Sequence, residues 1–111
     1  MGVTPAEKRE SLRPLYKGVL NKQTNDSIYL VNPSEATRGA SFFYFGKKIP
    51  VLRDQDVLSG QVDDRPGTIL LIDSMTDDTP LFSTLQSKGY RLLMQKKYGK
   101  TVGVYAYMNG S

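Results

Sequence analysis

The sequence contains neither cysteine nor histidine among its 111 residues. Without cysteine the chain has no disulfide bond, no thiolate nucleophile and no thiolate metal site. Without histidine it has no imidazole metal ligand and no catalytic triad that depends on histidine. The lack of cysteine is compatible with a location outside the cytoplasm, although it does not require one.

Long apolar segments are also absent. No run approaches the roughly 20 apolar residues that cross a bilayer as a helix, and no signal-peptide pattern opens the chain. A mass of 12.4 kDa is enough for one hydrophobic core. These features predict a single soluble domain, which can still be part of a longer protein.

Acidic residues are outnumbered, with 11 Asp and Glu against 15 Lys and Arg, and the net charge is +4. Such a balance suits an anionic membrane surface or a nucleic acid. Many solvated domains carry as much charge, and we take the ordinary solvated surface as the simpler interpretation.

The centre of the sequence reads as a strand, a helix and a second strand, at residues 28–31, 35–45 and 49–52. The first strand is β-branched and aromatic, and Pro33 stops it because proline has no amide hydrogen to donate. Ser34 can cap the helix that follows, and Gly46 is placed to end it. A right-handed βαβ unit is therefore predicted as the seed of the fold.

Before this unit, Thr4–Glu7 fits a capping box, but Pro14 would break a helix that ran through it. We therefore expect the first helix to begin at Ser11, with Pro14 in its first turn. Its apolar stripe is Leu12, Leu15, Tyr16, Val19 and Leu20. Residues 1–10 are predicted to be a flexible leader or juxtamembrane linker, and residues 11–111 a single α/β domain.

After the βαβ unit, Asp54 or Asp56 can cap a short helix, and Thr68–Ile72 is a strand apolar enough to be buried on both faces. Asp73–Thr79 is predicted to be a loop. A helix from Pro80 to Gly89 and strands at 90–97 and 101–108 complete the chain. The order predicts a three-layer α/β/α sandwich, with a Rossmann-like, mostly parallel five-stranded sheet that ends in an antiparallel hairpin.

Chemistry in such a fold is expected at the carboxyl ends of the strands. The loop Asn32–Gly39 has one glycine and no Walker lysine, so it does not form a phosphate cradle. Asp73, Asp77 and Asp78 could gather around Mg²⁺ as in response-regulator receivers. A receiver also needs an acidic pair after its first strand, and this chain lacks it.

Two aromatic clusters allow alternative interpretations. Tyrosines and cations near the C-terminus could bind single-stranded nucleic acid, or the cations could protect a sheet edge from pairing, which we favour. These residues are Tyr90, Arg91, Lys96, Lys97, Tyr98, Lys100, Tyr105 and Tyr107. The consecutive rings at 42–45 cannot all point inward from one helix, so at least one is expected at the surface or in contact with another domain.

The segments SLRPLYKGVL, SIYLVNPSEATRGASFFYFGKKIPVL, PGTILLID and GYRLLMQ resemble the soluble C-terminal domain of certain bacterial membrane glycosyltransferases. These enzymes are related to protein mannosyltransferases and aminoarabinose transferases. The aromatic stretch Phe43–Lys47 and the strand Ile49–Leu52 carry the match, which spans roughly Ser11 to Met108.

The resemblance implies a parent enzyme that transfers a sugar from a polyprenyl-phosphate donor, with its catalytic residues in the membrane part. It implies that this chain is a non-catalytic, periplasmic or extracellular accessory domain, whose partners are that membrane part and a sugar, lipid-linked or peptide acceptor. We predict no catalytic residue, cofactor or metal ligand. The predicted acceptor surface is Asn32, Ser34, Glu35, Arg38, Asp73 and Ser74. The alternatives are a free-standing receiver-like Mg²⁺ or small-ligand domain and a nucleic-acid-binding module.

Overall fold

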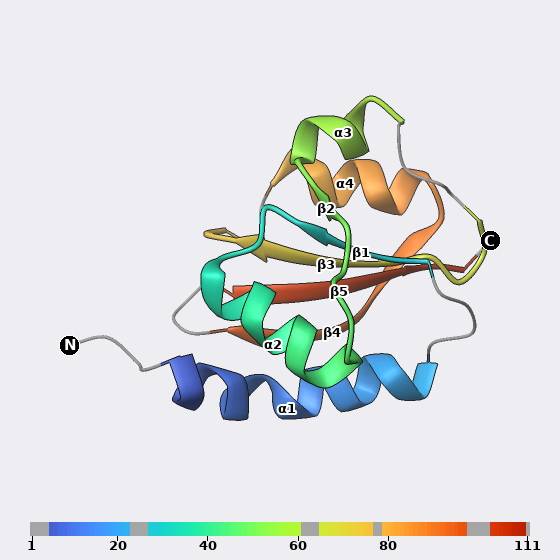
Figure 1. The fold of residues 1–111 in the computed structure, drawn as a ribbon. Helices are drawn as coiled ribbons and strands as arrows, with labels where there is room; N and C mark the ends of the chain where they lie inside the picture. The colour runs from blue at the N-terminus through green and yellow to red at the C-terminus, as the bar shows by residue number, and fades with distance from the viewer. Residues whose placement is uncertain (1–4, 23–26, 61–64, 77–78, 98–102, 111) are drawn as a thin grey trace.

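The computed structural model describes residues 5–22, 27–60, 65–76, 79–97 and 103–110 of the chain (Figure 1). Helices and strands alternate along most of this length. The elements are α1 (Pro5–Lys22), β1 (Ile28–Val31), α2 (Glu35–Phe45), β2 (Val51–Leu52), α3 (Asp54–Leu58), β3 (Ile69–Ser74), α4 (Pro80–Ser87), β4 (Tyr90–Lys97) and β5 (Gly103–Asn109).

The strands form one five-stranded mixed sheet in the order β2-β1-β3-β5-β4. Strand β1 lies between β2 and β3 and is parallel to both. Strand β5 lies between β3 and β4 and is antiparallel to both. The α/β class, the five strands and the closing antiparallel hairpin are thus confirmed.

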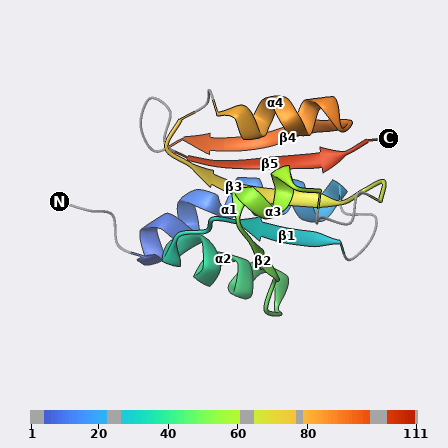
Figure 2. The same ribbon diagram turned by 90° about the horizontal axis from the view of Figure 1, so that it is seen from above.

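Two hydrophobic cores lie on opposite faces of the sheet. Helices α1 and α2 cover one face, and α3 and α4 cover the other (Figures 1 and 2). Strand β3 serves both cores, because Ile69 and Leu71 point to the first and Leu70 and Ile72 to the second. This alternation follows from the two-residue period of a strand, and it confirms that β3 is buried on both faces.

The first helix is longer than predicted. It begins at Pro5 and runs through Pro14 to Lys22, so the predicted start at Ser11 was wrong. Pro14 removes only the amide that would donate to Glu10, and it lies on the exposed side of the helix. The core side chains Leu12, Leu15, Tyr16 and Val19 are buried on both sides of it and hold the helix together. The role of residues 1–10 as a linker to another part of a longer protein stays a prediction.

One residue of the predicted apolar stripe differs from expectation. Leu20 is exposed, whereas the four preceding apolar positions are buried. The capping residue Thr4, on which the predicted capping box depends, lies outside the described residues.

Tyr16 joins α1 to α2 and is fully buried. Its hydroxyl donates to the Thr37 carbonyl oxygen at 3.2 Å and lies 2.5 Å from the Ser41 Oγ. Its ring stacks on Tyr44, with 5.0 Å between centroids. A hydrogen bond with Tyr44, together with the nearby Glu10 carboxylate, raises the pKa of the neighbouring Arg13 guanidinium. The two helices are therefore joined by both apolar and polar contacts.

The strand ends also differ from the prediction. Strand β2 contains only Val51–Leu52, although the Pro50 carbonyl already accepts from the Leu30 amide at 2.9 Å. Strand β3 extends through Asp73 and Ser74, which pair with β5, so the predicted loop starts two residues too early. Pairing with β5 satisfies the backbone of these two polar residues, which is why they continue the strand.

The cap of α4 agrees with the sequence, whereas α3 begins after Arg53 rather than after the predicted capping residue Asp54 or Asp56. Thr79 accepts a hydrogen bond from the Leu81 amide at 3.3 Å and begins α4, and Gly89 follows its end in the left-handed region. Asp56 accepts from the Arg53 amide at 2.9 Å at the start of α3. The position expected at Val62 lies outside the described residues.

A glycine substitution tests how much the intrinsic helix propensity of α2 contributes to the stability of the protein. Gly39 is exposed within α2, and a Cβ atom built on it meets nothing within 4 Å. Gly39→Ala should therefore raise the free energy of unfolding by about 0.5–1 kcal/mol, measured by urea denaturation. Gly103→Ala is the contrasting variant, because its Cβ would meet the Lys96 carbonyl oxygen, and it should be destabilising. Equal changes in the unfolding free energy of the Gly39→Ala and Gly103→Ala variants would contradict this explanation.

Alkaline pH tests the second core. Burial raises the pKa of Tyr107 above its ordinary value, although a hydrogen bond with Gln86 acts in the opposite direction. Above roughly pH 10 the unfolded chain loses this proton while the folded chain keeps it, so stability should fall as pH rises. Tyr107→Phe should lessen the decline in unfolding free energy between about pH 9 and pH 11. If the unfolding free energy of the wild type and of the variant falls equally over this pH range, Tyr107 does not contribute to the decline.

Candidate ligand pocket

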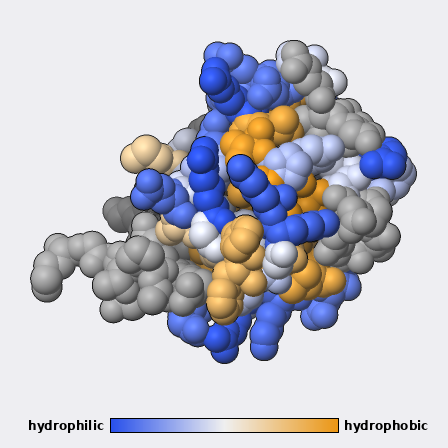
Figure 3. Space-filling view, in the orientation of Figure 1, coloured by the Kyte–Doolittle hydropathy of each residue, from blue (hydrophilic) through white to orange (hydrophobic). Residues whose placement is uncertain are grey.

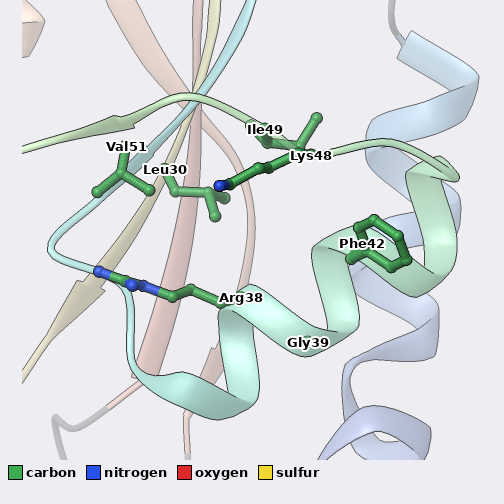
Figure 4. A pocket seen from close by; sticks show the side chains of 7 residues that line it. All are labelled: Leu30, Arg38, Gly39, Phe42, Lys48, Ile49 and Val51. Carbon is green, nitrogen blue, oxygen red and sulfur yellow. The ribbon is translucent and has the colours of Figure 1, made fainter.

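A pocket of about 500 Å³ opens between α2 and the β2 edge of the sheet (Figure 4). Strand β1, helix α2, the connection that follows α2 and strand β2 all contribute to its lining. The lining residues are Leu30, Arg38, Gly39, Phe42, Lys48, Ile49 and Val51.

The ends of α2 explain why this hollow forms. Ser34 caps the start of the helix by accepting from the Thr37 amide at 3.2 Å. At the other end Gly46 has φ 71°, and its amide donates to the Phe42 carbonyl at 3.0 Å. This left-handed residue turns the chain back, so that the connection to β2 returns beside the helix. Gly39 has no side chain, which leaves the space open.

The pocket combines apolar walls with two cations. Leu30 and Ile49 are buried and form its apolar base, while Arg38 and Lys48 are exposed. In Figure 4 these two cations extend toward the end where Val51 lies, and the Phe42 ring lies at the other end. Among the described residues, no ion pair joins Arg38 or Lys48 to a carboxylate. The chemistry therefore suits a ligand that has an anionic group and an apolar part.

Of the six residues predicted to form an acceptor surface, only Arg38 lines this pocket. Asn32 is exposed in the turn after β1, with φ 48°, and its amide donates to the Leu52 carbonyl at 3.0 Å. Glu35 is exposed in the first turn of α2. Ser74 donates to the Thr76 carbonyl at 2.6 Å and accepts from its amide at 3.2 Å, so its hydroxyl serves a local turn.

Ser34 and Asp73 are brought together through a residue that sequence analysis did not select. The Thr37 hydroxyl donates to Asp73 Oδ2 at 2.9 Å and lies 3.2 Å from Ser34 Oγ. This contact joins the carboxyl end of β3 to the start of α2. The signal was the serine at the cap followed three residues later by a second hydroxyl, a spacing at which both side chains face the helix start.

The pocket residues other than Arg38 were also not selected as a site. The feature of the sequence that could have indicated them is a local excess of positive charge, since they form no motif. From residue 36 to residue 53 the chain has four basic residues and no acidic one.

The structure bears on the two alternative sites. Asp77 and Asp78 of the predicted Mg²⁺ cluster lie outside the described residues, and the part of the chain that is described has no group of three potential metal ligands.

The tyrosines Tyr90, Tyr105 and Tyr107 are buried, and Phe82 contacts the last two rings, with ring centroids 4.9 and 5.1 Å apart. Buried rings cannot stack bases, so these three tyrosines do not form the alternative nucleic-acid surface, and Tyr98 and Lys100 lie outside the described residues. Strand β4 lies at the sheet edge, as the protective interpretation of its cations expects.

No protein family, curated protein or solved structure matches this chain. The resemblance to glycosyltransferase C-terminal domains therefore stays a hypothesis. Within the described residues, no helix combines the length and apolar character needed to span a membrane.

The contact between Thr37 and Asp73 can be tested by substitution. Thr37 is buried, and Thr37→Val keeps its shape while removing the donor. We expect a loss of about 1–3 kcal/mol in the free energy of unfolding, because the acceptor is a carboxylate. Ser87→Ala is the control, since it removes an exposed hydrogen bond to Ser83 within α4 and should change stability little. Similar losses in both variants would contradict a special role for the α2–β3 contact.

Proposed function

We propose that this chain is a non-catalytic binding domain whose ligand occupies the pocket beside α2. The observation that carries this proposal is the pairing of Arg38 and Lys48 over apolar walls. A guanidinium and an ammonium can together bind a phosphate or carboxylate, and the walls can take an attached hydrocarbon part. No reacting group is needed for this role, because binding and orientation are sufficient.

We further propose that the domain is the accessory part of a membrane glycosyltransferase, on the periplasmic or extracellular side. The resemblance rests on the βαβ unit, and the same unit supplies the whole lining of the pocket. In this proposal the sheet with helices on both faces is a three-layer, Rossmann-like sandwich. The membrane part of the parent would perform catalysis, and this domain would assist by holding a lipid-linked acceptor.

Geranyl phosphate, a short isoprenoid phosphate, is the probe for the pocket. Added to the ¹⁵N-labelled chain, it should shift the backbone amide signals of Leu30, Gly39, Ile49 and Val51. Geraniol and inorganic phosphate each supply only half of the ligand and should bind about tenfold more weakly or worse.

Substitutions in the pocket test whether geranyl phosphate binds there. Replacing Arg38 and Lys48 together by alanine should weaken binding by about tenfold or more, because it removes two charge-assisted contacts. Gly39→Leu should also weaken it by filling the space. Replacing Lys17 and Lys22, which are exposed on α1, by alanine is the matched control. Absence of shifts, or equal binding by all variants, would overturn the proposed ligand.

The parent enzyme has a separate test in the genome. The reading frame upstream of codon 1 should encode about ten hydrophobic spans with an acidic residue in the first outward loop. A reading frame without such spans would contradict the proposal of a glycosyltransferase parent, and the proposal of a binding domain would remain.

A further inference from the structure

The positive charge of the chain is concentrated in one segment. Residues 36–53 contain Arg38, Lys47, Lys48 and Arg53 and no acidic residue, and the other 11 basic residues equal the 11 acidic ones. The net charge of +4 therefore corresponds to this segment alone. The cations lie on α2, on the connection after it and directly after β2, which is a strand at the edge of the sheet.

The same edge exposes aromatic rings. Of the four consecutive rings of α2, Tyr44 and Phe45 pack against the first core, while Phe42 and Phe43 are 62% and 57% exposed. At least one surface ring was predicted, and the structure has two. Both lie in the last turn of α2, which Gly46 and the lysine pair follow.

The space-filling view shows how these groups combine. Over α2 and β2, long hydrophilic side chains lie next to apolar atoms, on the face toward the viewer (Figure 3). We call Arg38, Phe42, Phe43, Lys47 and Lys48 the α2 rim. Along the sequence its two exposed rings stand between Arg38 and the lysine pair, and the segment that bears the rim contains no carboxylate.

We propose that the α2 rim docks the domain on an anionic membrane surface. Large rings next to lysines suit the boundary between headgroups and acyl chains, because the rings enter the apolar layer while the cations stay at the phosphates. The charge matches an anionic leaflet, and the contact is peripheral rather than spanning. The rim shares Arg38, Phe42 and Lys48 with the pocket lining, whereas Phe43 and Lys47 lie outside it, so docking can be tested apart from the proposed pocket ligand.

Tryptophan reporters give a direct measurement, because the chain contains no tryptophan. Phe43→Trp should show a blue-shifted emission and quenching by brominated lipids when vesicles with one phosphatidylglycerol in four lipids are added. Met75→Trp is the matched reporter, since Met75 is 80% exposed on the loop after β3. Its emission should stay unchanged. Shifts of both reporters or of neither would overturn the proposal.

Vesicle co-sedimentation tests the contribution of each group. Neutral phosphatidylcholine vesicles should bind the chain at least about tenfold more weakly than the anionic ones, and so should the anionic vesicles in 0.5 M NaCl. Replacing Phe42 and Phe43 together by alanine should weaken binding by about tenfold, as should replacing Lys47 and Lys48 by glutamate. Glutamate at Lys17 and Lys22 makes the same change in net charge on α1 and should retain most of the binding.

The variants also separate this inference from the proposed function. Gly39→Leu should weaken binding of geranyl phosphate and leave vesicle binding intact. All substituted positions of the rim are exposed, so the circular dichroism spectrum and the urea midpoint should match the wild type. Equal losses in the rim and α1 variants would show non-specific attraction by net charge, and docking through the rim would be rejected.

Discussion

The double burial of β3 is the constraint on which the rest of the structure depends. Its four apolar residues, 69–72, are almost inaccessible to solvent, and they supply both cores in alternation. This four-residue run cannot include a polar residue on either side, and it needs helices on both faces of the sheet. Its hydrogen bonds to β1 on one side and β5 on the other complete the requirement, because no backbone group in a dry interior can be left unsatisfied.

Helix α2 is the element on which the proposed binding surface depends. Its inner side is fixed by Tyr16 on α1 and by the contact between Thr37 and Asp73 at the end of β3. Its outer side has no covering element among the described residues, and there Gly39 leaves a hollow and Phe42 extends toward solvent. The rigidity of one side lets the other side hold a ligand or a surface in a defined orientation.

Much of the fold could be predicted because local chemistry and tertiary packing agree. Strand β3 has a run of apolar residues that only a buried strand explains, and the caps at Ser34 and Thr79 have the donors and acceptors that begin helices. Prediction failed where packing outweighed local preference. Pro14 disfavours a helix interior, yet the buried side chains around it keep α1 continuous.

The site was harder to predict than the fold, since a pocket depends on how separate segments meet. Arg38 was selected for its place after β1, but Lys48 and Val51 join it only because Gly46 turns the chain back. Thr37 was missed because its partner, Asp73, lies 36 residues away in the sequence. Apart from the position of Arg38 after β1, the charge of residues 36–53 was the signal in the sequence that pointed to the edge with the candidate pocket.

The position of β5 has a consequence for how the protein is made. The last strand of the chain lies between β3 and β4, which do not pair with each other. During synthesis the ribosome therefore releases β1, β2 and β3 as one pairing group, while β4 has no neighbour to join. The sheet can close only once β5 has emerged from the ribosome. Until then one side of β3 stays open to pairing with other chains, a period in which a chaperone would protect it.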